Sequence, residues 1–252
     1  MPSVLAAPLA PPSAHPQPNL AAVAALIADP ARAAMVMALV DGRARPAGEL
    51  AYAAGVTAQT ASSHLGKLLD GGFLAVETEG RHRYYRLAGP HIAAAIEGLA
   101  AVGPAAAPRR RALGREARHL RFARCCYDHL AGRLGVAMTE AMRRRGFIAD
   151  APDKRFDVTP EGTLWFARLG LDVAALRPTR RGLARQCLDW TEREHHLAGP
   201  LGVQLLARLC ALGWLRRSTA SRLVELTPRG RLALREELGV EDRLLTPAGD
   251  QD

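Results

Sequence analysis

Cysteine and histidine are the residues of this 252-residue chain whose types and spacing are best suited to chemistry. The sequence HLAGRLGV, which begins at His129, recurs as HLAGPLGV 67 residues later, beginning at His196. Each copy is preceded by a cysteine and an aspartate, so that Cys126 aligns with Cys187. Thiolate and imidazole together are ligands for zinc, cadmium and lead. The candidate metal or effector site therefore consists of Cys126, His129, Cys187 and His196.

Other interpretations of these residues remain open. Arg124 and Arg185 lie within two residues of the cysteines and would lower a thiol pKa, which favours a site for an oxidant or a small organic effector. Alternatively, the cysteines are small core residues, as we expect for Cys210, and each His-Leu-Ala-Gly begins a packed helix. In the metal interpretation, Cys126 and His129 are expected on one helical turn, from which both can reach an ion.

A second pair of matching segments predicts how the chain around this site folds. DVTPEG, which begins at Asp157, matches ELTPRG, which begins at Glu225, at an offset of 68 residues. Thr159 and Thr227 are suited to helix N-caps, and each is followed by a proline suited to the first helical position. Each copy predicts a helix with an aromatic residue at its end, a short hairpin and a closing helix. We expect residues 125–240 to form one regulatory α+β domain of two helix–hairpin–helix repeats, followed by a tail over residues 241–252.

The first half of the chain predicts a different, mainly helical unit. Asp29 and Thr57 are suited to N-caps, whereas Gly42, Gly55 and Gly71 are suited to helix ends. After residue 72 the pattern changes from helical to alternating, and a turn at residues 79–80 predicts a two-stranded hairpin. The expected elements are helices Leu20–Ala28, Pro30–Asp41, Pro46–Ala54 and Ala58–Asp70, a hairpin over residues 73–87, and a helix His91–Val102.

The helix Ala58–Asp70 has one apolar and one polar side. Its apolar side is formed by Ala58, Ala61, Leu65 and Leu68. Its polar side has small, uncharged, hydrogen-bonding side chains and one lysine, which is typical of a helix that enters the major groove and contacts base edges. Arginines at the hairpin tip are placed to hold phosphates or the minor groove, whereas Tyr85 and Leu87 are expected to face the core. The candidate DNA contacts are Thr57, Gln59, Thr60, Ser62, Ser63, His64, Lys67, Arg81 and Arg83.

This part of the chain resembles the winged helix-turn-helix of ArsR/SmtB-type repressors. PAGELAYAAGVTAQTASSHLGKLLDGGFL, from Pro46, and EGRHRYYRL, from Glu79, carry the resemblance, above all the Ser-His-Leu at residues 63–65. The resemblance covers residues 20–103. It implies a homodimer formed through the outer helices Leu20–Ala28 and His91–Val102, a DNA operator with two half-sites, and repression relieved by an effector. A winged helix used only for protein contacts is the alternative.

The chain departs from this family at the family's metal sites. Members that sense metals often have Cys-x-Cys in the third helix, where this chain has GELAY at residues 48–52. Another site of the family uses Asp, His and Glu along the last helix, where this chain has only His91 and Glu97, without the usual spacing. We therefore expect the effector to be sensed in the added second half.

Composition limits the class of protein further. The net charge is +9, but residues 1–104 hold seven basic and seven acidic residues, so the excess lies in the second half. Gly103–Pro108 has the composition of a linker. The arginine-rich segment Arg109–Arg124 that follows is either a solvated connecting helix or a contact with DNA phosphates. We thus expect a linker and basic helix over residues 104–124, between the winged helix-turn-helix of residues 20–103 and the second domain.

The remaining expectations concern the ends of the chain and its environment. No run of about 18 apolar residues suggests a membrane span. Residues 1–19 are expected to be a disordered tail rather than a signal peptide, and four cysteines without a signal predict the reducing cytoplasm. Taken together, the sequence predicts a mainly α fold with small β-hairpins, and a homodimeric repressor that Zn, Cd, Pb or a thiol oxidant releases from DNA. A thiol-dependent enzyme built on Cys126 and His129 is the alternative, although no Gly-rich phosphate loop or Gly-x-Ser-x-Gly motif is present.

Overall fold

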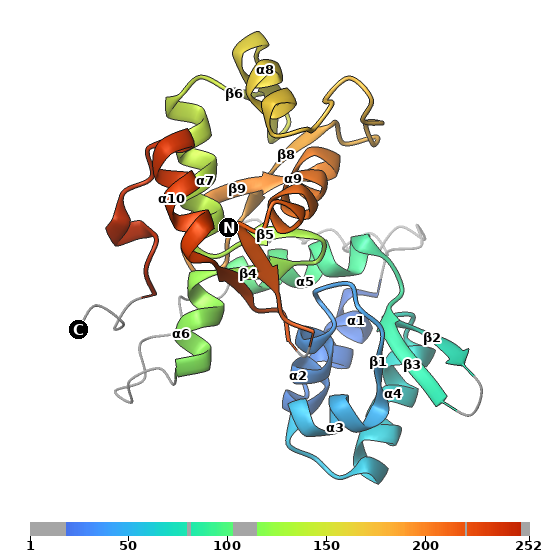
Figure 1. The fold of residues 1–252 in the computed structure, drawn as a ribbon. Coiled ribbons are helices and arrows are strands. Elements are labelled where there is room, and N and C mark those ends of the chain that lie inside the picture. Colours follow the sequence, from blue (N-terminus) through green and yellow to red (C-terminus); the bar gives the residue numbers. More distant parts are fainter. Residues whose placement is uncertain (1–18, 80–81, 103–114, 220, 248–252) are drawn as a thin grey trace, which may run out of the picture.

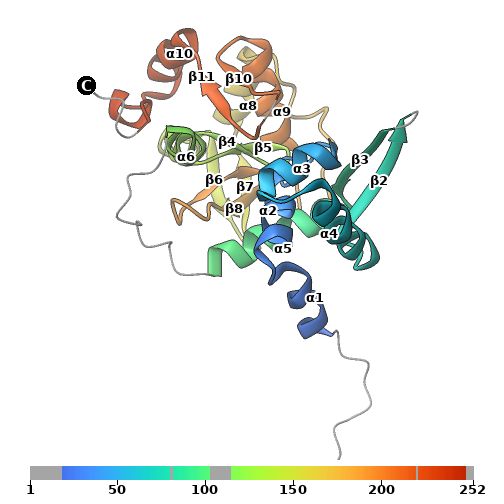
Figure 2. The ribbon, with the colours of Figure 1, turned by 90° about the horizontal axis from the view of Figure 1, so that it is seen from below.

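The computed structural model describes residues 19–79, 82–102, 115–219 and 221–247. Within them a winged-helix unit and a C-terminal α+β domain pack against each other, with helix α5 (Pro90–Val102) between the two (Figures 1 and 2). The expected tail up to residue 18, the wing-tip residue Arg81 and the expected linker lie outside the described residues.

The winged-helix unit follows the expected order of elements. Asp29 caps its helix by accepting a hydrogen bond from Arg32 N at 3.0 Å, and Thr57 accepts one from Thr60 N at 3.2 Å. Before α5 the unit contains α1 (Leu20–Ile27), α2 (Pro30–Ala38), β1 (Arg45–Pro46), α3 (Ala47–Ala54), α4 (Ala58–Asp70), β2 (Leu74–Glu79) and β3 (His82–Leu87).

Two details differ from the sequence-based expectation. Helix α2 ends at Ala38 rather than at Asp41, because Arg45 turns back, donates to Ala38 O at 3.1 Å and pairs with Asp41 at 2.7 Å. The hairpin is also joined by a third strand, β1, which pairs antiparallel with β3. A strand of two residues has no alternating pattern, so the sequence could not indicate it.

The apolar side of α4 and the inner side of the hairpin form one core. Leu65 and Leu68 are fully buried, and Tyr85 and Leu87 are 5% and 2% exposed, which confirms that these two residues face the core. Ala58, at the first turn of α4, is exposed instead. The hairpin pairs β2 with β3 in a continuous register from Leu74 opposite Leu87 to Glu79 opposite His82.

The C-terminal domain has the order hairpin, helix, hairpin, helix twice over. Its first set is β4 (Arg124–Cys126), β5 (His129–Ala131), α7 (Arg133–Arg144), β6 (Ile148–Ala151), β7 (Arg155–Val158) and α8 (Pro160–Arg168). Its second set is β8 (Ala184–Leu188), β9 (His195–Ala198), α9 (Gly199–Ala211), β10 (Leu215–Arg217), β11 (Val224–Leu226) and α10 (Pro228–Leu238). Helix α6 (Arg115–Phe122) precedes the first set.

The expectation that His-Leu-Ala-Gly begins a helix is wrong. In both copies His-Leu-Ala is a β-strand, and the helix starts only at the glycine or just after it. Gly132 and Gly199 have φ angles of +83° and +79°. A positive φ is readily adopted only by glycine, so this residue makes the sharp change from strand to helix.

Strands from both sets pair with each other, always antiparallel. Strands β6, β7, β8 and β9 form one four-stranded sheet, in which β7 of the first set pairs with β8 of the second. On the other side, β11 lies beside β4, because Cys125 N donates to Arg222 O at 2.8 Å and Val224 N donates to Ala123 O at 3.1 Å. Neither set could form these sheets alone.

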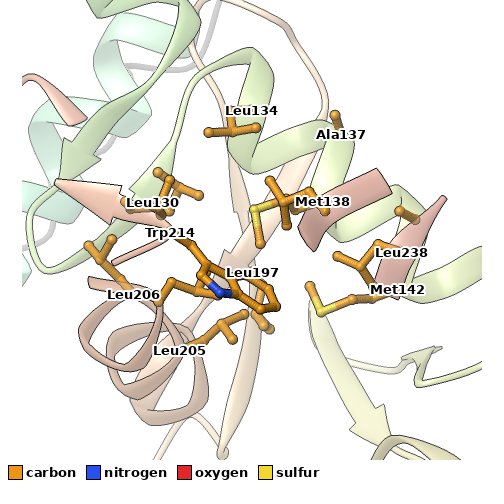
Figure 3. Packing of buried hydrophobic residues seen from close by; sticks show 14 of the residues in the cluster. Leu130, Leu134, Ala137, Met138, Met142, Leu197, Leu205, Leu206, Trp214 and Leu238 are labelled. Atoms are coloured by element: carbon orange, nitrogen blue, oxygen red, sulfur yellow. The ribbon is translucent and has the colours of Figure 1, made fainter. Parts of the chain in front are cut away.

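Helices of both sets share one hydrophobic core, and Figure 3 shows side chains of α7, α9 and α10 packed in it. Thr159 and Thr227 cap α8 and α10 by accepting from Gly162 N at 3.0 Å and Gly230 N at 2.9 Å, which confirms both predicted caps. A Cβ on either glycine would lie 2.0 Å or less from a backbone oxygen of the preceding aromatic residue. The motif therefore requires glycine, because the start of each helix lies directly against the backbone of Phe147 or Trp214. Trp165 of α8 is fully buried.

The end of the described chain is packed rather than free. Residues 242–244 form a 3-10 helix, and Val240 and Leu245 are 2% and 0% exposed. The expectation of a tail from residue 241 is therefore wrong for residues 241–247.

In the described part of the chain no single helix is long and apolar enough to cross a membrane. Helices α1 and α2 together have the necessary length and apolar composition, but they meet at a bend of 83°.

Candidate DNA interface and metal centre

Helix α4 presents most of the predicted DNA contacts to solvent. The turn before it is closed by Gly55, whose φ of +64° ends α3 in the left-handed conformation. The side chains exposed along α4 and its cap are Thr57, Gln59, Thr60, Ser62, Ser63 and Lys67. On the wing, Arg83 is exposed. These residues lie where a helix-turn-helix contacts duplex DNA.

His64 is an exception to this arrangement. Its side chain is 15% exposed, and its Nδ1 lies 3.8 Å from Asp29 Oδ1 and 3.4 Å from Arg32 Nη1. These contacts connect α4 to the start of α2. His64 is thus packed against α2, and its contact with DNA stays a prediction.

The four candidate metal or effector residues meet in one cluster. Cys126 pairs directly across the β4–β5 hairpin with His129, and Cys187 pairs across β8–β9 with His196. The expectation of a shared helical turn is wrong, since both pairs lie on facing strands. Strand β5 packs against β9, so the two hairpins bring their Cys–His pairs together.

The spacing of the donor atoms fits a tetrahedral ion. One donor atom from each of the four residues lies within 4.8 Å of all the others. The two Sγ atoms are 3.8 Å apart and the two histidine Nε2 atoms are 3.1 Å apart. Zn–S bonds of about 2.3 Å and Zn–N bonds of about 2.0–2.1 Å at tetrahedral angles require roughly 3.8 Å and 3.4 Å. The donor types and these two distances therefore suit a zinc-like ion, which would draw together the donors that now lie up to 4.8 Å apart.

Aspartates orient both histidines toward the centre. His129 Nδ1 lies 3.0 Å from Asp128 Oδ1, and His196 Nδ1 lies 3.5 Å from Asp189 Oδ2, which is an ion-pair distance without hydrogen-bond geometry. A carboxylate at Nδ1 keeps the proton there and leaves the Nε2 lone pair for a metal. Two lone pairs at 3.1 Å repel each other, so the arrangement calls for a proton or a cation between them.

The protonation states within the cluster are strongly perturbed. Burial raises the pKa of Cys126 well above its ordinary value. Its contacts with Cys126 and the two histidines hold the pKa of Cys187 far below its ordinary value. Burial opposes the charged form of His129, but its contacts with Asp128 and Cys187 raise its pKa to about 9. Without metal, the cluster thus holds the Cys187 thiolate next to the His129 imidazolium. An ion that binds all four residues must displace the proton of Cys126 and one proton of His129.

Glu97 is a fifth residue at the cluster, which the sequence analysis did not include. It lies on α5 of the winged-helix unit and is 7% exposed. Cys126 Sγ donates to its Oε1 at 2.5 Å, and Cys187 Sγ lies 3.8 Å from its Oε2. Burial and the nearby Cys187 raise the pKa of Glu97 to about 7. The available signal was a carboxylate on the same helical side as Ala93 and Ile96, which are both buried.

Arg124, which the sequence places two residues before Cys126, interacts with Asp189 and Trp190. Arg124 is 2% exposed, pairs with Asp189 at 2.8 Å and stacks over the Trp190 ring at 4.7 Å. Burial raises the pKa of the neighbouring Cys125 to about 12. The lowered pKa of Cys187 is caused by its contacts with Cys126 and the two histidines, and burial raises the pKa of Cys126, so Arg124 is not among the main causes of either shift. Cys210 is half-buried against the hydrophobic core, away from the cluster.

Comparison with known proteins identifies the DNA-binding part. A family model described as "Helix-turn-helix domain" matches residues 27–77. The chain is 44% identical over 224 residues to the uncharacterized HTH-type transcriptional regulator YdfF of Bacillus subtilis, which covers 89% of this chain and 99% of YdfF. The chain belongs to the ArsR/SmtB-type transcriptional regulators.

Other relatives of this ArsR-type regulator match a smaller part. The HTH-type transcriptional regulator CmtR of Mycobacterium tuberculosis is 39% identical over 83 residues, which is 33% of this chain and 70% of CmtR. A solved structure titled "cadmium metal-sensor CMTR" from the same organism is 34% identical, covers 38% of this chain and 98% of that chain, and has a TM-score of 0.29. The cluster described above lies mainly in the C-terminal domain of this regulator, with Glu97 contributed by the winged-helix unit.

Proposed function

We propose that this ArsR-type regulator is a repressor that binds a soft or borderline metal ion and then leaves its DNA operator. The ion is held by Cys126, His129, Cys187 and His196. The observation that carries the proposal is the spacing of the four donor atoms, above all the 3.8 Å between the two sulfurs. Zinc, cadmium and lead suit two thiolates and two imidazoles.

Charge balance supports an ion at this buried position. Two thiolates cancel the charge of a divalent ion, so that the loaded cluster adds no net charge to the interior. A buried charge is tolerated only where it is paired. In the metal-free protein Glu97 instead accepts the hydrogen of the buried Cys126 thiol.

Glu97 carries the signal to the DNA-binding unit. In the metal-free protein its carboxylate accepts the thiol hydrogen of Cys126, which fastens α5 to the C-terminal domain. When Cys126 binds an ion as its thiolate, this proton would be released to solvent. Glu97 then faces a metal-bound sulfur without a hydrogen to accept, and α5 loses a favourable contact. The protein thus binds the ion with different affinities in two conformations, which differ in the position of α5. Allosteric coupling requires such a difference.

The repressor acts as a homodimer on two half-sites. Helix α1 and one side of α5 leave apolar side chains in solvent: Leu20 is 74% exposed, Leu99 is 53% exposed and Val102 is 84% exposed. In Figure 2, α1 extends away from the C-terminal domain. These exposed surfaces are available to a second copy, so a shift of α5 changes the distance between the two α4 helices. We place the protein in the cytoplasm, where its thiols stay reduced, and interpret the C-terminal domain as a duplicated unit.

Oxidation of the two thiols is a second candidate signal. The Sγ atoms of Cys126 and Cys187 need to approach from 3.8 Å to about 2.05 Å to form a disulfide. The depressed pKa of Cys187 supplies the thiolate that attacks a peroxide, and Cys126 then displaces water from the sulfenic acid. This oxidation also removes the hydrogen that Glu97 accepts.

Metal binding and DNA release are measured together on the full-length protein. Metal-stripped, reduced protein is dialysed against Zn, Cd or Pb, and its affinity is measured for a duplex that the protein itself has selected in vitro. We expect one ion per chain and weaker DNA binding with the ion bound. The double variant Cys126→Ser with Cys187→Ser should lose both, whereas Cys125→Ala, a buried neighbour outside the cluster, should keep both.

The opposite results separate the alternatives. Undiminished metal binding by the double variant would refute the proposed site. DNA release by peroxide but not by any metal would assign the cluster to redox sensing.

A further inference from the structure

We propose that the cleft along α5 binds a small organic anion with at least two negative charges, a phosphate ester or a polycarboxylate. This ligand is distinct from the metal ion and would be a second effector of the regulator. The cleft lies between α5 of the winged-helix unit and the loop and strands of the C-terminal domain.

The cleft is large enough for a metabolite. It has two adjoining lobes of about 770 and 780 Å³, one toward each end of α5, and both are lined by Ala94, Glu97 and Arg185. Small-molecule sites typically have volumes of about 300–1,000 Å³. The small side chains of α5, at Ala94, Gly98 and Ala101, leave this space open along one side of the helix.

Five cationic side chains of the cleft have no carboxylate partner among the described residues. No carboxylate in the described part of the chain pairs with the cleft residues Lys154, Arg177, Arg180, Arg181 and Arg185. The carboxylates of the lining are already engaged: Cys126 donates to Glu97, Asp128 pairs with His129, and Asp153 with Arg155. The cleft therefore carries a concentrated positive charge from three separate segments of the chain.

Arg185 lies at the centre of this charge. It lines both lobes, and its Nε is buried without a hydrogen-bond partner among the described residues. A buried donor without a partner costs about 1–3 kcal/mol. Guanidinium groups match the oxygens of phosphates and carboxylates and form strong, often bidentate hydrogen bonds with them. An oxyanion in the cleft would satisfy Arg185 and engage Arg180 and Arg181 at the mouth.

The shape of the site favours a small molecule over DNA. The cleft is concave, and in both views α4 and β8 lie on opposite sides of α5 (Figures 1 and 2). A duplex on α4 would thus be directed away from the cleft. One lobe is also lined by Leu176, Pro200 and Val203, which would contact the apolar part of an organic ligand.

The test uses full-length, metal-free protein and isothermal titration with pyrophosphate and with citrate, with glucose as the uncharged probe. We expect saturable binding of one or both anions and none of glucose. Pyrophosphate alone would indicate a phosphate ester, and citrate alone a polycarboxylate. The variant Arg180→Ala with Arg181→Ala should weaken binding at least about tenfold, since it removes charge-assisted hydrogen bonds.

Two matched variants make the result specific. Arg168→Ala with Arg229→Ala removes the same charge from exposed positions outside the cleft and should leave anion binding unchanged. Gly98→Leu keeps all charges but extends into a lobe, where an added Cβ meets no atom within 4 Å, and should abolish binding.

Several outcomes would overturn the inference. It fails if the wild-type protein binds neither anion, or if both double variants lose affinity equally. Loss of DNA affinity on Arg180→Ala with Arg181→Ala, without anion binding by the wild type, would reassign these arginines to the DNA backbone. Cadmium stoichiometry is measured in parallel, so that a failed anion site and a failed metal site are distinguishable.

Discussion

The contact between Glu97 and Cys126 gives the most direct test of how the two units communicate. The change is Glu97→Gln, which keeps the size of the side chain and its hydrogen-bonding oxygen but removes the charge. The contact is buried, so it is not screened by solvent. The variant should still bind metal, because all four ligands remain.

The expected magnitude follows from the loss of this one contact on metal binding. A hydrogen bond to a charged group contributes about 1.5–3 kcal/mol, and a neutral one about 0.5–1.5 kcal/mol. At about 1.4 kcal/mol per tenfold change, the ion should weaken DNA binding of the wild-type protein roughly 10- to 150-fold. The Glu97→Gln variant should respond only roughly 2- to 12-fold.

The assay is fluorescence anisotropy of the selected duplex, with and without saturating cadmium. It is run at about pH 8, where Glu97, with a pKa of about 7, is ionised. Glu140→Gln, an exposed change on α7, is the control and should respond like the wild type. The reasoning is refuted if Glu97→Gln releases DNA as fully as the wild type while its metal affinity is unchanged.

Four further predictions concern the same regions. Asp128→Asn should weaken metal affinity about 10- to 100-fold in a chelator competition, because Asp128 orients His129 and is exposed enough for the fold to tolerate the change. Asp189→Asn should lower the free energy of unfolding in urea by about 3–5 kcal/mol, because it leaves the charge of Arg124 buried and unpaired. Burial alone would raise the pKa of Asp189, but Arg124 and its other partners hold it well below its ordinary value, so this stability is present above about pH 4 and lost as the pH falls further. Thermal melts down to about pH 2 should show that loss in the wild type and much less of it in Asp189→Asn. Ser63→Ala with Lys67→Ala should weaken DNA binding with unchanged circular dichroism, and an unchanged titration would refute the assignment of α4.

Much of the local structure could be predicted because it depends on neighbouring residues. The caps at Thr57, Thr159 and Thr227 are formed with backbone groups only three residues away. The apolar side of α4 follows from helical spacing alone. The repeated Cys and His indicated four residues that the fold does bring together, because equivalent positions in two similar hairpins face each other.

Other features have no local signal. Strands of two or three residues, such as β1 and β5, are too short to show alternation, so His129 of β5 was expected on a helix. The pairing of β7 with β8 depends on hydrogen bonds between strands separated by the whole of α8 and the loop that follows it. A buried ion pair such as Arg124 with Asp189 joins residues 65 positions apart.

The sequence by itself determined the winged helix, its polar recognition side and the set of thiol and imidazole donors, since these follow from residue type and short-range spacing. Only the tertiary structure decided that the donors surround a single point and that Glu97 of the other unit lies against them. The reason is physical: a tetrahedral set of donors and a carboxylate above it are defined by distances of a few ångströms between four strands and a helix. Those distances result from the packing of the two units, which no single segment specifies.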